Sequence, residues 1–350
     1  MRRLAAGALL GALGVMSFVA PASSAQARDL YVYGHSLTTG AGLDDPALVY
    51  TRLIIDDEHW TTLHSFGVNG SLVHEAAERL YGTGEASWST GTSADVLIEA
   101  NLNTARDFGA DPLALATSRN ALRVMLATVD ASRRIEDSNR SHTWSAGWRT
   151  QKMSWASGGA VHVTTRNNSY VEFKAIGGEY VSIRGVSGAG ATIRLSDRTT
   201  GHTVTRIKTG KRVHPAYDHA GVPVLYRIPA SMAKHTIRMT KESGTGSFTF
   251  DARLPQRSDP GTVILVEEPY LADYSLSTAH PNGSDAAIDA FNGVLDTLAN
   301  EFSNALTVDL DAAGWDPAIY LQADGVHPNE AGNRFMADAV DVAYDAHMAR

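Results

Sequence analysis

The feature that most constrains the fold is a change in hydrophobic pattern partway along the chain, followed by a return to the first pattern. Up to about residue 140, short apolar runs alternate with stretches of helical period, which is typical of βαβ units and a parallel sheet. Over residues 141–255 the helical period disappears, and short β-rich segments follow one another between Gly, Asn and Asp. The alternation then resumes. We therefore expect one α/β domain, residues 28–140 and 256–350, interrupted by an all-β sandwich insert at residues 141–255.

The two patterns predict individual elements. In the α/β parts we expect strands over 30–33, 62–66, 96–100, 263–267 and 306–310, and helices over 47–56, 72–81, 113–135, 286–302 and 329–347. In the insert we expect strands over 161–165, 170–175, 180–186, 192–195, 224–228, 236–239 and 248–250. Open α/β sheets bind ligands at the carboxyl ends of their strands, so polar residues there are the first candidates for a site.

The first 27 residues have the pattern of a targeting segment. Arg2 and Arg3 precede an apolar run from Leu4 to about Ala20, and small residues follow, up to Ala27. This order predicts a secretory signal peptide over residues 1–27 and an extracellular mature protein. The paired arginines leave the twin-arginine route open, but the rest of that pattern is missing, so we favour the general secretory route. No later stretch approaches the length of a membrane span, so we expect no stable membrane insertion.

The chain contains no Cys, which limits the chemistry available to it. Disulfides, thiolate metal sites and a Cys nucleophile are excluded. There is no His-Glu-x-x-His pattern, and we interpret the scattered His59, His64, His74 and His162 as structural residues. We therefore expect no metal and no cofactor, and catalysis by hydroxyl, imidazole, carboxyl or amide side chains.

Charge is divided unevenly between the two expected domains. The whole chain has 30 Lys and Arg against 38 Asp and Glu, a formal net charge of −8. Residues 141–255 hold 16 basic and 6 acidic residues, whereas the α/β parts hold 12 and 32. The α/β domain is thus unsuited to nucleic acid, while the insert could bind an anionic polysaccharide.

The insert also contains aromatic residues that suit sugar recognition. Its texture resembles that of jelly-roll carbohydrate-binding modules, and Trp144, Trp148 and Trp155 could stack on sugar rings. They could equally be core residues, because Trp is highly buried on average. Both interpretations stay open at this point.

Two short segments at opposite ends of the α/β domain carry candidate catalytic groups. Ser36 follows the first expected strand directly, in a Gly-His-Ser segment. Near the other end, Asp324 precedes His327 by three residues. An Asp at that separation can accept a hydrogen bond from Nδ1 of the ring, which leaves Nε2 to take a proton from a serine hydroxyl. Neither segment is specific by itself.

Taken in order, these segments resemble the sequence blocks of the SGNH-type (GDSL) serine hydrolases. Ser36 falls on the nucleophile of the first block, Gly70 on the second block, Asn103 on the third, and Asp324 and His327 on the last pair. The resemblance covers residues 28–140 and 256–350 and implies a three-layer, flavodoxin-like fold. It also implies a catalytic triad of Ser36, His327 and Asp324. The implied oxyanion hole combines the backbone N–H groups of Ser36 and Gly70 with the side-chain amide of Asn103.

Three positions depart from the family pattern. His35 replaces the usual Asp, while Asn101 and Thr104 replace the Gly and the second acid of the third block. The leading hypothesis is a secreted esterase that deacylates, most simply deacetylates, a polysaccharide through an acyl-enzyme. Two alternatives stay open: a lipid esterase or lipase, and a glycan-binding protein whose hydrolase site is inactive.

Overall fold

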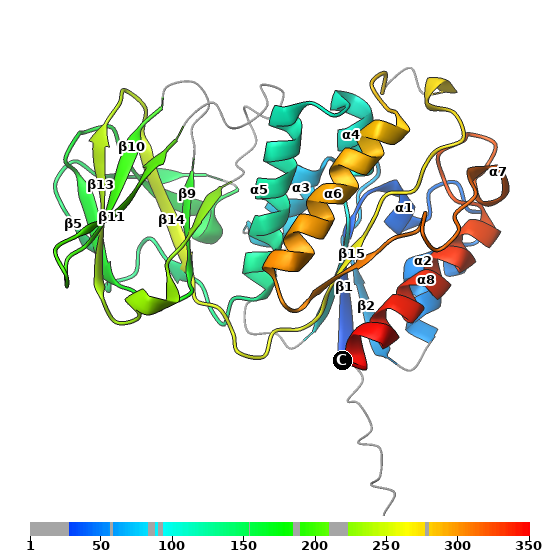
Figure 1. The fold of residues 1–350 in the computed structure, drawn as a ribbon, viewed down its shortest axis with the longest axis horizontal. Helices are drawn as coiled ribbons and strands as arrows, with labels where there is room; N and C mark the ends of the chain where they lie inside the picture. The colour runs from blue at the N-terminus through cyan, green and yellow to red at the C-terminus, as the bar shows by residue number, and fades with distance from the viewer. Residues whose placement is uncertain are drawn as a thin grey trace, which may run out of the picture.

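The computed structural model describes residues 28–56, 59–82, 88–89, 94–153, 155–184, 190–209, 223–276 and 280–350. The expected signal peptide, residues 1–27, lies outside the described residues. The described chain forms two bodies that lie side by side, one built around a parallel sheet and the other from antiparallel strands (Figure 1). We call them the α/β body and the β body.

The α/β body contains a five-stranded sheet in which every neighbouring pair of strands is parallel. Its strands are β1 (Arg28–Gly34), β2 (Trp60–Ser65), β3 (Asp95–Glu99), β15 (Val263–Val266) and β16 (Ala305–Val308). They lie in the order β2-β1-β3-β15-β16, the order of flavodoxin-like sheets, whose ligands bind where the chain changes direction between the first and third strands. The predicted α/β class with a parallel sheet is confirmed.

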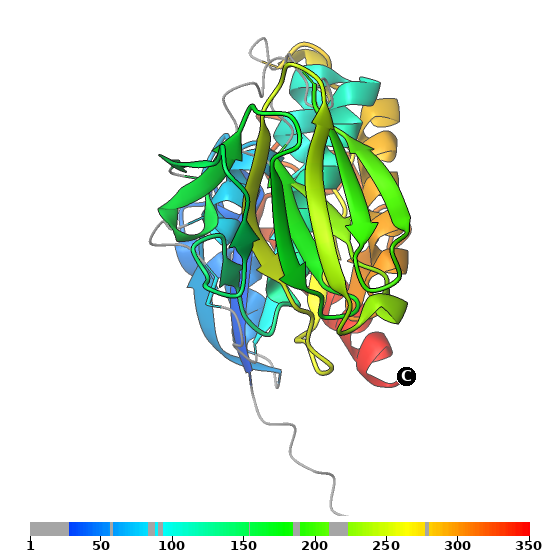
Figure 2. The ribbon, with the colours of Figure 1, turned by 90° about the vertical axis from the view of Figure 1, so that its left-hand side faces the viewer.

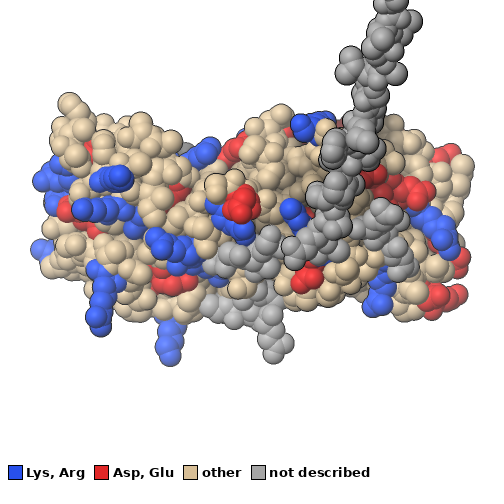
Figure 3. Space-filling view, turned by 90° about the horizontal axis from the view of Figure 1, so that it is seen from below, with Lys and Arg blue, Asp and Glu red and all other residues tan. Residues whose placement is uncertain are grey.

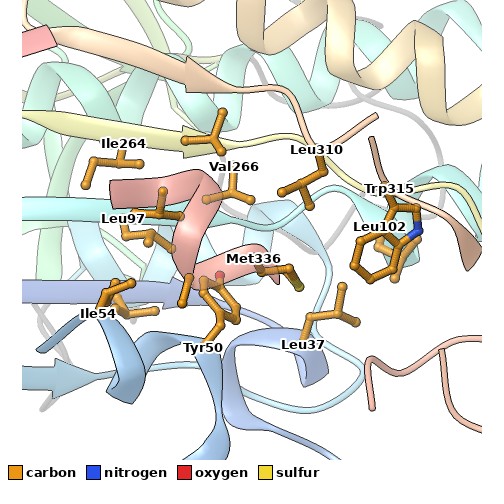
Figure 4. Packing of buried hydrophobic residues seen from close by; sticks show 14 of the residues in the cluster. Leu37, Tyr50, Ile54, Leu97, Leu102, Ile264, Val266, Leu310, Trp315 and Met336 are labelled. Atoms are coloured by element: carbon orange, nitrogen blue, oxygen red, sulfur yellow. The ribbon is translucent and has the colours of Figure 1, made fainter. Parts of the chain in front are cut away.

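Helices cover both faces of this sheet, because alternate side chains of each strand point to opposite faces. Helices α2 (Tyr50–Leu53) and α8 (Glu330–Met348) pack on one face, and α3 (Val73–Tyr81), α5 (Pro112–Val129) and α6 (Asp285–Glu301) pack on the other (Figure 1). The core of the first face includes Leu97, Ile264 and Met336; Leu97 and Ile264 lie next to each other, and Met336 lies nearer to Tyr50 and Leu37 (Figure 4). The central strands β3 and β15 are thus buried on both faces, whereas the edge strand β2 is partly exposed. In the centre of the sheet only the strand ends are free to form a site.

The β body consists of two antiparallel sheets. One has the order β11-β10-β13-β8-β5, and the other has the order β12-β9-β14-β7-β6, with β4 also paired to β14 (Figure 2). The strands are β4 (Ile135–Glu136), β5 (Thr143–Trp144), β6 (Arg149–Lys152), β7 (Ala160–Thr164), β8 (Tyr170–Lys174), β9 (Tyr180–Arg184), β10 (Thr192–Asp197), β11 (Thr203–Lys208), β12 (Val224–Arg227), β13 (Thr236–Ser243) and β14 (Phe248–Leu254). Phe173 of the first sheet and Phe250 of the second share one hydrophobic core.

The chain passes between the two bodies near residues 131 and 256. The helix expected over 113–135 ends earlier, at Val129, because the chain then joins the β body: Ala131 forms a β-bridge with Gln256, and Ile135 pairs with Arg253 of β14. Antiparallel pairing therefore begins before residue 141.

A second expected helix, over 47–56, is broken in the structure. It consists of a 3-10 turn over Pro46–Leu48, the short α2, and another 3-10 turn over Ile54–Asp56. Val49 is extended between the first two, and the N–H of Tyr50 donates to Asn333 Oδ1 of α8 at 3.0 Å. A tertiary hydrogen bond therefore takes the place of a helical one.

The β body packs against the helical layer of the α/β body. Tyr180 of β9 and Leu254 of β14 belong to the same hydrophobic cluster as α3 and α5. At this contact the Tyr81 hydroxyl donates to Asp251 Oδ2 at 2.6 Å, and the Tyr180 hydroxyl donates to Glu301 Oε1 at 3.2 Å. Lys and Arg side chains gather on the β body, and Asp and Glu side chains are more frequent toward the far end of the α/β body (Figure 3). None of the described helices is long and apolar enough to span a membrane.

Candidate active site

The candidate nucleophile lies where β1 ends. After Gly34 the chain turns at His35 and enters the short helix α1 (Ser36–Thr39), so Ser36 stands at the carboxyl edge of the sheet. Only Gly fits at position 34, because a Cβ there would lie 2.4 Å from the Thr38 side chain and 2.5 Å from the Glu99 carbonyl oxygen. The Ser36 residue is 7% exposed, so its hydroxyl is almost enclosed by its surroundings.

The candidate base and its partner lie in the loop between α7 (Pro317–Tyr320) and α8. With the Asp324 carboxyl ionised, Nδ1 of His327 donates to Asp324 Oδ2 at 2.6 Å. The other oxygen, Oδ1, accepts from the backbone N–H groups of Val326 and His327 at 2.9 and 3.0 Å. Partial burial raises the pKa of Asp324, but these hydrogen bonds outweigh it and hold the pKa below its ordinary value. The local turn therefore orients the ring and leaves Nε2 free.

A cavity of about 400 Å³ at the carboxyl edge of the sheet brings these segments together. It is lined by Ser36, Ala41, Asn69, Gly70, Asn103, Arg106, Leu276, His280, Asp324, Val326 and His327. All five site residues inferred from the sequence are in this set, although their roles stay predictions. Among the described residues no hydrogen bond joins Ser36 Oγ to His327 Nε2; such contacts are often long before a substrate binds.

Backbone and amide donors suited to an oxyanion line the same cavity. Gly70 has a φ of 73°, in the left-handed region, so its backbone conformation rather than a lack of space requires Gly. Within the described chain, the N–H groups of Ser36 and Gly70 donate to no other group. Asn103 Nδ2 donates one hydrogen bond to the Ser71 carbonyl oxygen at 3.1 Å, which fixes the amide and leaves its second N–H for a ligand.

Two of the departures from the family pattern brace this arrangement. The Thr104 hydroxyl oxygen accepts from the N–H of Val73 at 3.2 Å, so it ties helix α4 (Leu102–Phe108) to the start of α3. The Asn101 side-chain oxygen accepts from the Ser118 hydroxyl at 2.7 Å. Both interactions hold the loops that carry the candidate oxyanion donors.

The third departure, His35, belongs to a buried hydrogen-bonded pair beneath the nucleophile. Its Nε2 lies 3.1 Å from each carboxyl oxygen of Glu268, and both residues are fully buried. Its Nδ1 accepts from the N–H of Leu37, the residue after the nucleophile, at 3.3 Å. Burial alone would lower the pKa of His35, but the charge and hydrogen bonding of Glu268 outweigh it and raise that pKa. Where the GDSL pattern has an Asp, this chain thus has a histidine that is hydrogen-bonded to a carboxyl group.

A second buried carboxyl lies beside this pair. Glu99, at the end of β3, accepts a hydrogen bond from the Tyr50 hydroxyl at 2.7 Å. Burial, together with the negative charge of Glu268, raises the pKa of Glu99 to about 8, so it is protonated at neutral pH. Sequence reasoning missed both acids, although Glu99 directly follows an apolar run and Glu268 stands one residue beyond the end of another, positions where a buried acid needs a partner.

Sequence reasoning also missed Arg106. This residue follows Asn103 by three positions on α4, so both side chains lie on the same helical face and line the cavity. The described residues contain no group of three or more His, Asp or Glu placed to hold a metal ion.

The Trp residues of the β body pack within it and not around the cavity. The Trp144 ring stacks on His162, with 4.3 Å between ring centroids, and meets Trp148 edge-on at 4.7 Å. Trp155 is 6% exposed. Each residue that lines the cavity belongs to the α/β body. Trp155 is thus a core residue, whereas Trp144 and Trp148 are half-buried and pack against the edge of the core.

No protein-family model matches the sequence, and no curated protein matches it. The solved structures that resemble the chain include an esterase, a lipase/acylhydrolase and a member of the lipolytic protein G-D-S-L family. They include the lipase/acylhydrolase from Enterococcus faecalis, with 14% identity and a TM-score of 0.43 over 92% of this chain and 96% of that chain. A member of the lipolytic protein G-D-S-L family from Veillonella parvula DSM 2008 has 12% identity and a TM-score of 0.39 over 91% and 99%. A two-domain esterase (CEX) active on acetylated mannans has 8% identity and a TM-score of 0.32 over 66% and 92%.

Proposed function

We propose that the protein is a serine carboxylic ester hydrolase whose triad is Ser36, His327 and Asp324. The observation that carries the proposal is the position of Ser36 in one cavity with the oriented Asp324–His327 pair and with N–H donors that have no partner in the described chain. A hydroxyl, a base with a fixed tautomer and preset oxyanion donors are the parts that acyl transfer requires.

The reaction follows from these roles. His327 Nε2 takes the proton of Ser36 Oγ as the hydroxyl attacks the ester carbonyl, and the ionised Asp324 stabilises the imidazolium. The N–H groups of Ser36 and Gly70 and the amide of Asn103 receive the oxyanion. His327 then protonates the departing alcohol, and the same base activates the water that hydrolyses the acyl-enzyme.

We further propose that the natural ester is a small acyl group, such as acetyl, on a polysaccharide. The small number of apolar side chains around the cavity supports this: among the described residues that line it, only Ala41, Leu276 and Val326 have apolar side chains. A lipase needs a long apolar groove for its acyl chain. The well-oriented Asp324–His327 pair also speaks against an inactive, purely glycan-binding site.

The experiment that tests the proposal compares wild type with Ser36→Ala on nitrophenyl esters of increasing acyl length. We expect wild type to hydrolyse the acetyl ester best and Ser36→Ala to be inactive while folded. A fluorophosphonate should label Ser36 covalently. Equal activity in the variant would contradict the role of Ser36, and a maximum at long chains would favour the lipase alternative.

An extracellular location is part of the proposal, on the basis of the pattern in residues 1–27. Expression of the full chain in a secreting host, followed by N-terminal sequencing of the medium fraction, tests it. We expect a mature N-terminus near Arg28; retention of the protein inside the cells would contradict it.

A further inference from the structure

The guanidinium of Arg106 faces the catalytic cavity and has no partner among the described residues. Arg106 is 6% exposed, yet its side chain makes no hydrogen bond and no ion pair with any other described residue. The other buried arginine of the described residues is paired: Arg253, 2% exposed, donates to both carboxyl oxygens of Glu179 at 3.0 and 2.8 Å. An isolated buried charge is costly, so a protein keeps one where a ligand completes it.

The acidic groups nearest to Arg106 are already engaged. The Asp107 carboxylate pairs with Nδ1 of His280, another residue that lines the cavity. Both oxygens of Asp324 are occupied by His327 and by two backbone N–H groups. Burial lowers the pKa of Arg106, and the charges of Asp107 and Asp324 only partly offset this. The positive charge of Arg106 is therefore available to an anion that enters the cavity.

We propose that Arg106 binds a carboxylate of the substrate, so that the preferred ester carries a carboxylate close to its scissile carbonyl. This inference rests on the proposed esterase function and names the substrate class of the same site. A planar guanidinium can bind a carboxylate through two parallel hydrogen bonds, which fixes both the position and the orientation of the substrate. Because Arg106 lies one helical turn beyond Asn103, a carboxylate held there lies beside the candidate oxyanion hole.

The volume of the cavity is consistent with this substrate class. About 400 Å³ exceeds what an acetyl group alone requires, so part of the space is left for the neighbouring portion of the ester. The carboxylate could belong to the alcohol portion, as in an acylated uronic acid, or to the acyl portion, as in a dicarboxylic monoester. The chemistry that Arg106 recognises is the same in both.

The test uses two pairs of esters, each differing by methylation of one carboxylate. The first pair, 4-acetoxybenzoate and its methyl ester, places the charge on the alcohol portion. The second, monophenyl glutarate and methyl phenyl glutarate, places it on the acyl portion. The readout is the release of the phenol, expressed as the ratio of kcat/KM for the charged ester to kcat/KM for the neutral one. Comparison of this ratio between variants cancels the intrinsic reactivity of each ester.

We expect wild type to prefer the charged member of one pair, and Arg106→Met to reduce that ratio by about 10- to 100-fold, the range for a charge-assisted hydrogen-bonded pair. Arg106→Lys keeps the charge but not the planar fork of the guanidinium, so it should give an intermediate ratio. If the Met variant does not fold, the Lys variant takes its place in the test. Arg119→Met, at an exposed position on α5, is the matched control and should keep the wild-type ratio.

Two outcomes overturn the inference: no preference of wild type for either charged ester, or an unchanged ratio in both Arg106 variants. Neither outcome affects the esterase proposal, which is tested separately by the loss of neutral-ester hydrolysis in Ser36→Ala. If that hydrolysis survives in Ser36→Ala, the esterase proposal fails, and the charge preference fails with it as a property of this site.

Discussion

The two bodies of the molecule treat buried charge in different ways. In the β body, Arg253 and Glu179 are fully buried and neutralise one another through two hydrogen bonds. At the carboxyl edge of the parallel sheet, Arg106 has no partner in the described chain, and Glu99 stays protonated at neutral pH. Buried charges that are satisfied internally hold a structure together, whereas unsatisfied or shifted ones are concentrated at functional sites. A shifted carboxyl occurs in the β body too, since burial raises the pKa of Asp251, so it is the unpaired Arg106 that favours the α/β body as the place of the chemistry.

The largest expected effect is the loss of the nucleophile. Ser36→Ala or His327→Ala should lower kcat for acetyl ester hydrolysis by about 10⁴- to 10⁶-fold, because the hydroxyl and the base act as one unit. Steady-state kinetics measures the loss, and circular dichroism with thermal unfolding checks that both variants fold. Activity within tenfold of wild type in either folded variant would show that the catalytic site does not lie at the carboxyl edge of the parallel sheet.

Next in size are the two buried pairs, His35 with Glu268 and Arg253 with Glu179, which compare the bodies directly. His35→Ala leaves Glu268 buried without its imidazole, and Arg253→Met leaves Glu179 unpaired, so each should reduce the free energy of unfolding by about 3–5 kcal/mol in urea denaturation. Only His35→Ala should also lower kcat/KM under conditions where both variants are folded, because His35 holds the N–H of Leu37 beside the nucleophile. A loss of kcat/KM in folded Arg253→Met would contradict the inference that only the α/β body takes part in catalysis.

The oxyanion hole should give a smaller effect on catalysis. Asn103→Ala removes one preset donor and should lower kcat by about 10²- to 10³-fold. Asn69→Ala is a control because its side chain lines the same cavity and is the acceptor for the Thr39 hydroxyl. We expect its effect on kcat to be less than that of Asn103→Ala. Equal losses in the two variants would show that the cavity's shape matters and not the Asn103 amide.

The last prediction concerns the dependence of stability on pH. An unfolded Glu loses its proton near pH 4.5, whereas folded Glu99 keeps it up to about pH 8. Between these values the folded protein binds more protons, so its stability falls as pH rises, by up to about 1.4 kcal/mol per pH unit for one such group. His35 also makes the protein less stable as pH rises. Its contribution to the free energy of unfolding is complete below pH 6.5 and is lost as pH rises through the raised pKa of His35.

Thermal unfolding between pH 5 and pH 8 measures this dependence. Glu99→Gln, which cannot ionise, should flatten the fall in Tm with pH, and Glu330→Gln at an exposed position should leave it unchanged. If Glu99→Gln has the same slope as wild type, the carboxyl is not the group that holds a proton beneath the active site.

Much of the fold could be predicted from local pattern. The expected parallel strands agree with β1, β2, β3, β15 and β16 to within a few residues, because a strand buried on both faces is an unusually apolar run. Helix α4 was missed: it has only seven residues and contains Asn103 and Thr104, which favour non-helical conformations. Because Arg106 lies on this helix, its position in the cavity was missed as well.

The candidate triad residues could be proposed because their separations are short or their blocks are ordered along the chain. Asp324 and His327 are three residues apart, so one turn is enough to join them. The partner of His35 could not be found in this way, because Glu268 lies 233 residues away and meets it only where β1 and β15 end at the same edge. The same holds for Trp144, whose stacking on His162 depends on which strands pair.

The sequence by itself determined the alternation of strands and helices, the β-rich interruption and the local Asp324–His327 pair, because each depends on residues close together in the chain. Only the tertiary structure decided which charges are neutralised and which are left for a ligand. Whether Arg106 has a partner depends on every element packed around it, and that is a property of the assembled cavity. No stretch of the sequence contains it.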